Sequence, residues 1–232
     1  MVGNSIFCPR NKDDLHKAVD NWCAYREETC ARLGDISTWD VSHITDMCYL
    51  FAFKHSFNDD ISAWTVSQVT NMSDMFNCAN AFNQPIHKWD VSNVTDMSWM
   101  FNDAHAFNQP INSWNVSKVT NMSWMFSNAH AFNQPIGGWD TSQVTYMIGM
   151  FNGAYAFDQT IGGWNVSSVI NMSAMFKDAH AFNQPIGDWD VSNVTEMDSM
   201  FYYANSFNQP LVNWNVTQVT DDIRRFRYLY VK

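Results

Sequence analysis

The sequence predicts a repeat solenoid: a right-handed coil of about eight 25-residue repeats with short parallel strands, short helical turns and a helical N-terminal cap. Two observations predict this fold. A tryptophan recurs every 25 residues with no insertion or deletion, at Trp39, Trp64, Trp89, Trp114, Trp139, Trp164, Trp189 and Trp214. The hexapeptide AFNQPI occurs at residues 81–86, 106–111, 131–136 and 181–186, and near-copies fill the other repeats. So regular a period indicates one structural unit built repeatedly.

The apolar residues of the repeat occupy fixed columns, counted with each tryptophan as column 1. The consensus is W-[D/N]-V-S-x-V-T-[N/D]-M-S-x-M-F-x-x-A-x-A-F-N-Q-P-I-x-x, in which columns 9 and 12 hold 13 of the 14 methionines. Apolar residues fall at columns 1, 3, 6, 9, 12, 13, 16, 19 and 23, which matches neither a sustained helical period nor a long strand alternation. We therefore expect a coil whose inward residues stack on their copies in the next coil.

Local patterns suggest three elements within each coil. The step Ile-x-x-Trp-x-Val, as in residues 86–91, predicts a short strand because β-branched and aromatic residues favour strands. The following Val-Thr-Asn-Met step predicts one to two helical turns, with a threonine cap and with Met97, Met100 and Phe101 on one face. The Phe-Asn-Gln-Pro-Ile step predicts a return arc, where stacked asparagines can satisfy backbone amides that no strand pairs.

Both ends of the chain are expected to cap the solenoid. Leu15, Val19 and Trp22 lie on one face of a predicted helix that can cover the first coil. In the eighth repeat Asp222 and Arg225 replace the two methionine columns, which indicates a C-terminal cap. The predicted division is an N-terminal helical cap at 1–35, seven repeats at 36–213, and a divergent eighth repeat with the C-terminal cap at 214–232.

Composition excludes several classes of function. The 232-residue chain carries a net charge of -10, so it repels phosphate backbones and we expect no nucleic-acid partner. Although 46% of the residues are hydrophobic, no apolar run approaches the roughly 20 residues of a membrane span. No signal peptide is visible in the opening MVGNSIFCPRNKDD.

Five cysteines lie in the first third of the chain, at Cys8, Cys23, Cys30, Cys48 and Cys78. An odd number means that at least one is free or pairs with another chain. Disulfides near the N-terminus and buried thiols both fit the pattern, and no pair has the spacing of a zinc site.

The pattern FNQPIGDWDVSNVTEMDSMF at residues 182–201 resembles the BspA-type leucine-rich-repeat family of surface proteins, in particular its 25-residue W-D-V-S-x-V-T-x-M-x-x-M-F class. Residues 13–47 resemble the segment that commonly precedes such repeats. The resemblance implies a leucine-rich-repeat-like solenoid, an extracellular or cell-surface location, and adhesion or interaction rather than catalysis. The chain departs from lipoprotein members of the family in showing no lipobox leader.

The candidate binding residues lie on columns that the core does not use. Column 2 lies between two inward columns, so its side chains should point outward and line an exposed face. The column 2 candidates are Asp40, Asp90, Asn115, Asp140, Asn165, Asp190 and Asn215. Lys88 stands at the variable position before its tryptophan, and Trp99 and Trp124 are neighbours in column 11 that the consensus does not require. Exposed indoles are typical of protein or carbohydrate contacts.

From these observations we expect a non-catalytic recognition or adhesion module, without a cofactor and monomeric rather than oligomeric, which binds a protein or glycan through the exposed face. A self-associating surface-coat protein is the alternative. Two less favoured alternatives are metal binding by the column 17 histidines, His55, His105, His130 and His180, and ice binding by the serine and threonine columns.

Overall fold

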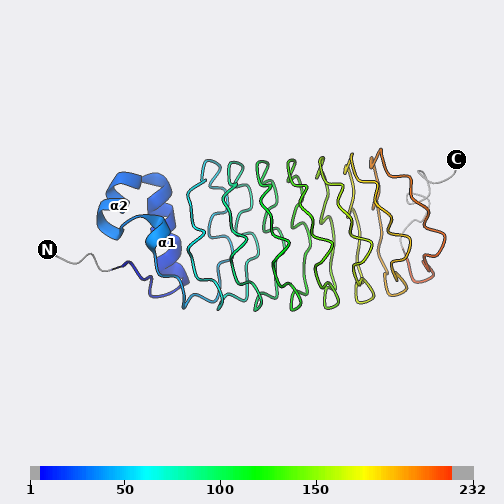
Figure 1. Ribbon diagram of the computed structural model, residues 1–232, viewed down its shortest axis with the longest axis horizontal. Coiled ribbons are helices and arrows are strands. Elements are labelled where there is room, and N and C mark those ends of the chain that lie inside the picture. The colour runs from blue at the N-terminus through cyan, green and yellow to red at the C-terminus, as the bar shows by residue number, and fades with distance from the viewer. Residues whose placement is uncertain (1–5, 221–232) are drawn as a thin grey trace.

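The chain is a stack of coils with two helices at one end, as the computed structural model shows for residues 6–220 (Figure 1). Residues 25 apart in the sequence are neighbours in space, and the N–H of Thr95 donates to the carbonyl of Thr70 at 2.8 Å. The chain is therefore a repeat protein, as its period predicts. The predicted C-terminal cap, with Asp222 and Arg225, falls mostly on residues 221–232, which lie outside the described part of the chain.

Two helices cover the first coil. Helix α1 spans Lys12–Ala24 and helix α2 spans Arg26–Leu33, and a 3-10 turn, η1, follows at Ile36–Thr38. Helix α1 begins at Asn11, whose side chain accepts a hydrogen bond from the N–H of Asp14 at 3.0 Å. It buries Leu15, Val19 and Trp22, the three residues whose spacing predicts the helix. The amphipathic helix is broken at Tyr25, where φ is -139° and ψ is 59°.

A backbone ladder joins each coil to the next over columns 8–15. The N–H of Met97 donates to the carbonyl of Asn121 at 3.0 Å, and the N–H of Phe101 donates to the carbonyl of Met125 at 2.9 Å. Column 8 forms isolated parallel bridges, which link Asp46, Asn71, Asp96, Asn121, Tyr146, Asn171 and Glu196 in turn. These bridges are the strand-like pairing of the described coils.

The strand predicted at Ile-x-x-Trp-x-Val is wrong. In residues 86–91 the N–H of Trp89 donates to the carbonyl of Ile86 at 3.1 Å, which closes a turn. Ile86 and Trp89 are both buried and stand three residues apart, whereas the side chains of a strand alternate with a period of two. The backbone must turn to bring both inward.

The helical turns predicted after this step are also wrong. The N–H of Met100 donates to the carbonyl of Met97 at 3.3 Å, which closes a tight turn rather than an α-helical turn. Columns 11 and 15 are left-handed, with φ of 60° at Trp99 and 54° at Asp103 in this coil. A left-handed residue every four positions cannot continue a right-handed helix, and the N–H groups of columns 9, 11, 13 and 15 turn to the next coil.

The column 7 threonines join coils instead of capping helices. The hydroxyl of Thr95 donates to the carbonyl of Thr70 at 3.1 Å, beside the backbone bond between the same residues. The same contact recurs in later coils, at Thr120, Thr145, Thr195 and Thr220. The described residues therefore hold turns and isolated bridges where the leucine-rich-repeat resemblance implies short strands and helical turns.

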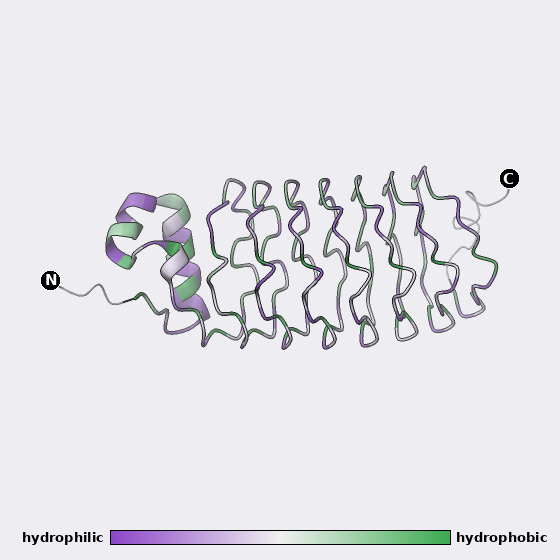
Figure 2. Cartoon of the chain, in the orientation of Figure 1, coloured by the Kyte–Doolittle hydropathy of each residue, from purple (hydrophilic) through white to green (hydrophobic). Residues whose placement is uncertain are grey.

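The core is a set of parallel ranks of Met, Phe and Trp side chains. Phe101 stacks on Phe126 of the next coil with ring centroids 5.7 Å apart, and on Phe107 of its own coil at 4.0 Å. The indole of Trp114 donates to the carbonyl of Ile86 in the preceding coil at 3.1 Å. Hydrophobic and hydrophilic residues alternate along every coil (Figure 2). Each coil thus buries its apolar surface both within itself and against the adjacent coils, as in a repeat array.

The return arc is held by an asparagine ladder. The Oδ1 of Asn108 accepts from the N–H of Asn133 at 3.0 Å and from Nε2 of Gln134 at 2.9 Å. The expectation that stacked asparagines satisfy backbone amides is therefore confirmed. The glutamine of the arc also belongs to the ladder, because Gln134 donates to the carbonyl of Asn108 as well.

Candidate recognition face

The column 2 side chains lie on the exposed surface, and each Asp or Asn among them shapes a turn of its own coil. The Oδ1 of Asp90 accepts from the N–H of Ser92 at 3.1 Å, and that of Asn115 accepts from the N–H of Ser117 at 3.2 Å. The same contact recurs at Asp40, Asp140, Asn165, Asp190 and Asn215. These contacts are Asx turns, which account for the column without any ligand.

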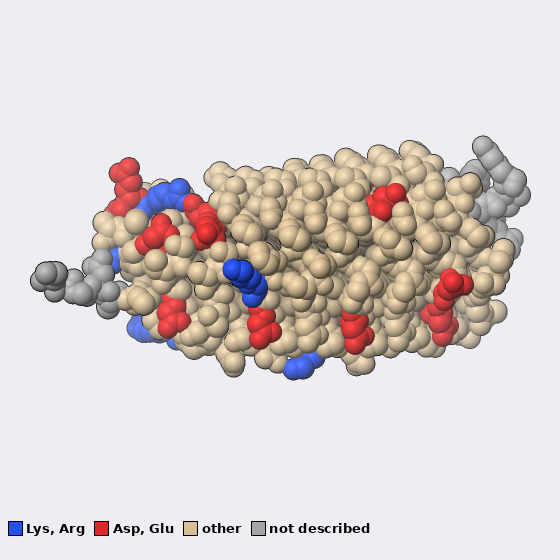
Figure 3. Space-filling model, viewed as in Figure 1, with Lys and Arg blue, Asp and Glu red and all other residues tan. Residues whose placement is uncertain are grey.

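The carboxylates of column 2 are stabilised in their charged form. Hydrogen bonds from the hydroxyl and N–H of Ser92 lower the pKa of Asp90. Serine hydroxyl and N–H groups likewise lower the pKa values of Asp40, Asp140 and Asp190. Lys88 is exposed near Asp90. In Figure 3 acidic groups lie at spaced positions along the lower edge of the solenoid, one of them beside a basic group, and they do not form one acidic cluster.

The two column 11 tryptophans form a stacked pair. The indoles of Trp99 and Trp124 have centroids 5.1 Å apart and planes inclined by 21°. Both residues have φ of 60°, and Trp99 is 36% exposed. The next residue of the column is Gly149, and a Cβ added there would stand 2.3 Å from the Trp124 ring. The glycine therefore gives the second indole the space in which it lies.

Further exposed aromatic residues lie on columns 8, 11, 14, 15 and 17. Those of columns 8–17 that are at least 36% exposed are Tyr49, Phe53, Trp99, Tyr146, Tyr155, Tyr202 and Tyr203. Together with Trp124 they form what we call the aromatic face. Sequence reasoning singled out the column 11 aromatics but missed Phe53, Tyr146, Tyr155, Tyr202 and Tyr203. The signal was present, because each is an aromatic residue in a column whose other copies are mostly polar or small.

Column 17 runs along this face as a stack of rings. His105 and His130 are 4.4 Å apart and parallel to within 4°, and Tyr155 and His180 continue the stack. Burial lowers the pKa of His130, and the neighbouring His105 lowers it further. Parallel rings direct their nitrogens side by side rather than toward a common point, which does not suit a shared metal ion.

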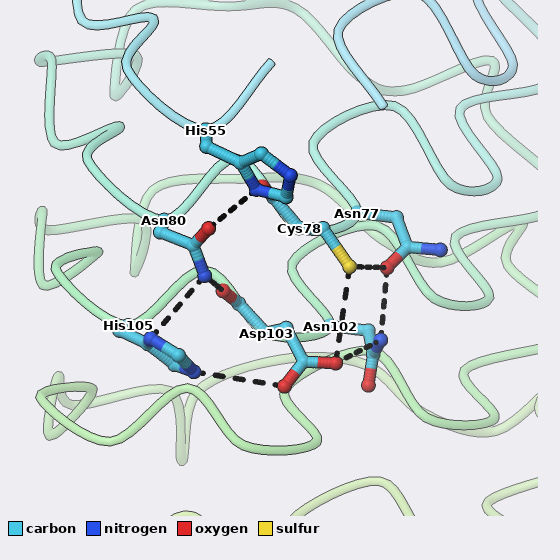
Figure 4. Close-up of polar contacts among 7 residues, drawn as sticks. All are labelled: His55, Asn77, Cys78, Asn80, Asn102, Asp103 and His105. Atoms are coloured by element: carbon cyan, nitrogen blue, oxygen red, sulfur yellow. Dashed lines mark hydrogen bonds and ion pairs between the residues drawn. The ribbon is translucent and has the colours of Figure 1, made fainter. Parts of the chain in front are cut away.

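Polar contacts connect the histidines with the adjacent coils (Figure 4). The Nδ1 of His55 contacts Asn80 Oδ1 at 2.6 Å and the carbonyl of Cys78 at 2.9 Å. The Nδ2 of Asn80 lies 3.2 Å from Nδ1 of His105, and Nε2 of His105 lies 3.6 Å from Asp103. Within residues 6–220, no three His, Cys, Asp or Glu side chains are grouped so as to hold a metal ion. All five cysteines are free thiols.

The fold and this face define a class: a repeat solenoid with a helical cap at its N-terminal end and an aromatic surface over its inter-coil ladder. The chain belongs to the family described as Mycoplasma protein of unknown function, DUF285, which matches residues 22–139 and 122–229. No curated protein matches the sequence. In the described part of the chain, no helix has the length and apolar character that crossing a membrane requires.

Proposed function

We propose that the chain is a non-catalytic recognition module that binds a glycan through the aromatic face. The observation that carries the proposal is the stacked pair Trp99 and Trp124. The repeat does not require these indoles, since the same column holds Asp74, Gly149 and Ala174 in other coils. Left-handed backbone is costly for bulky residues, so an indole placed there and partly exposed has no evident structural benefit.

A glycan fits this face better than the column 2 surface does. Aromatic rings present flat apolar area that packs against the C–H face of a sugar ring, and their polar atoms bond hydroxyl groups. Trp99 and Trp124 stand on adjacent coils with ring centroids 5.1 Å apart, so together they offer a stacking surface wider than one ring. The Oδ1 atoms of the column 2 Asp and Asn residues, in contrast, already accept hydrogen bonds within turns.

We also propose that this solenoid is a variant of the BspA-type leucine-rich repeat and acts at the cell surface. The proposal is supported by the 25-residue period, by burial of the Met, Phe and Trp columns and by parallel bridges between coils. Labelling of intact cells with a membrane-impermeant reagent tests the location. Labelling only after lysis would contradict it.

A glycan array probed with the purified protein tests the binding function. The variant Trp99→Ala/Trp124→Ala should lose at least about tenfold in affinity for any glycan that binds, because both stacking surfaces are removed. Tyr25→Ala is the control, since Tyr25 is 64% exposed on the helical cap and is not one of the residues of the aromatic face. Equal loss in both variants, or binding only to proteins on a parallel protein array, would overturn the glycan proposal. Assembly that grows with concentration in both variants would support the coat alternative.

A further inference from the structure

A pocket of about 630 Å³ lies between the helical cap and the first coil. The cap lines it with Trp22, Cys23 and Arg26, and the coil lines it with residues 53–59. Its volume falls in the range of about 300–1,000 Å³ that is usual for small-ligand sites. The pocket lies at the N-terminal end of the aromatic face and shares Phe53 with it.

One wall of the pocket presents a fixed cation. The guanidinium of Arg26 lies 5.0 Å from the centroid of the Trp22 ring. Asp59 accepts a bond from Nε1 of Trp22 at 2.8 Å and forms an ion pair with Nη2 of Arg26. The Arg26 side chain is nevertheless 56% exposed. Because guanidinium carries five N–H donors, Arg26 can keep Asp59 and still bind an incoming carboxylate.

The docking of the cap accounts for some departures of the first coil from the consensus, but not for Phe53. Asp59 bonds the cap, and Lys54 pairs with Asp20 of α1 at 2.6 Å. Phe53, in contrast, is 61% exposed and has φ of 61°. Its column holds Cys78, Asp103, Asn128, Gly153, Asp178 and Tyr203 in the other coils. The exposed phenyl ring of Phe53 buries little apolar surface, and a left-handed backbone is unfavourable for a bulky residue, so neither accounts for a phenylalanine at this position.

His55, another lining residue of the pocket, adds a hydrogen-bond acceptor. Both oxygens near Nδ1 of His55, those of Asn80 and Cys78, can only accept, so Nδ1 carries the proton of the neutral ring. The tautomer leaves Nε2 as an acceptor for a ligand hydroxyl. A purely apolar ligand would strip water from this nitrogen without replacing its bond, which is unfavourable.

We propose that this pocket binds a sugar-acid residue, with its carboxylate on Arg26, the C–H face of its ring on Phe53, and a hydroxyl on Nε2 of His55. The lining carries two cations, Arg26 and Lys54, against one carboxylate, Asp59, in a chain whose net charge is -10. Asp20 lies outside the lining and is paired with Lys54. Both cations therefore already have a carboxylate partner, and an anionic ligand would be held by the N–H donors of Arg26 that its ion pair with Asp59 leaves free.

Titration of the whole chain with glucuronate and galacturonate, followed by saturation-transfer NMR, tests the proposal. Glucose serves as the neutral probe. Phe53→Asn should weaken binding of the acids by about tenfold, since the stacking surface is lost. Asn already occupies this column at Asn128, and it tolerates a positive φ, so the variant should fold. Tyr203→Asn makes the matched change in the last coil and should leave binding unchanged.

Arg26→Gln should abolish the preference for the acids over glucose while the helical content of the cap is retained. The proposal is overturned if neither acid binds saturably, if glucose binds equally well, or if Phe53→Asn binds as the parent does. The inference extends the proposed glycan recognition but shares only Phe53 with the aromatic face. If the Trp99→Ala/Trp124→Ala test fails, the proposal for the pocket is therefore not contradicted. If the sugar acids do not bind the pocket, the proposal for the aromatic face is not contradicted.

Discussion

Replacing Asn108 by alanine should weaken the junction between two adjacent coils by about 1–2 kcal/mol. The substitution removes the Oδ1 that accepts from the N–H of Asn133 at 3.0 Å and from Nε2 of Gln134 at 2.9 Å. A typical hydrogen bond contributes about 0.5–1.5 kcal/mol net, and a buried N–H left without an acceptor costs about 1–3 kcal/mol. Asn133 is half-buried, and Gln134 keeps its bond to the carbonyl of Asn108, so the lower half of this range applies.

The control is Asn108→Asp, because the chain itself makes this change in a later coil. There the Oδ1 of Asp158 accepts from the N–H of Asn183 and from Nε2 of Gln184, both at 2.9 Å. The aspartate variant keeps the acceptor, and its stability should stay within about 0.5 kcal/mol of the parent.

Urea unfolding followed by tryptophan fluorescence measures the global effect, and hydrogen exchange of peptides that contain the Asn133 amide measures the local one. Exchange is needed as well because the cooperativity of long repeat arrays can break down. If the alanine and aspartate variants unfold at the same urea concentration and exchange alike at Asn133, the ladder does not stabilise the arc.

Two further predictions concern column 11. In Gly149→Ala the new Cβ would stand 2.3 Å from the Trp124 ring, so the indole should move. The near-UV circular dichroism of the stacked pair should therefore fall, and the free energy of unfolding should drop by about 1–3 kcal/mol. Gly138→Ala is the control, because its Cβ meets nothing within 4 Å and should change neither the circular dichroism nor the stability. Burial raises the pKa of Asp74, so the folded protein loses stability as pH rises from about 4 through that raised pKa. Asp74→Asn should therefore unfold at a higher temperature than the parent at pH 7 but not at pH 4. If the parent instead becomes less stable between pH 7 and pH 4 while the variant does not change, the raised pKa of Asp74 is contradicted.

The core of each coil could be predicted from the sequence because it depends on which residues are apolar and how often they recur. The Met, Phe and Trp columns are buried in every complete coil, with Trp89 at 4% exposed and Phe101 at 0%. A periodic apolar column can be buried only by stacking on its own copy, so the stacked coil follows from the spacing alone. The backbone conformation between those columns does not follow from the spacing.

The turns were missed because their determinants are backbone bonds between coils rather than residue preferences. Tryptophan at position 99 predicts nothing about a left-handed φ, yet column 11 is left-handed whether it holds Trp99, Asp74 or Gly149. The ladder imposes this conformation, since the N–H of column 11 must reach the carbonyl of the next coil. Tertiary bonding has overridden local propensity at these positions.

The candidate site, too, could be predicted from the sequence only in part. Trp99 and Trp124 could be found in the sequence because they depart from their column, and the structure brings them into contact. The pocket could not be found, because α1 and the first coil meet there through Trp22 and Asp59, which are 37 residues apart. Sequence spacing within the repeat carries no information on how the cap docks.

Departures from the repeat are therefore the most informative residues of this chain, provided that each is first compared with its structural role. Asp59 departs from the glutamine of its column, and its bond to Trp22 explains the departure fully. Phe53 departs from a mostly polar or small column, and no contact of the cap requires its exposed ring. Column 15 is left-handed in every described coil and has no common residue, but most of its members are polar or small, as an exposed left-handed position favours; the exposed phenyl ring of Phe53 therefore indicates a ligand contact.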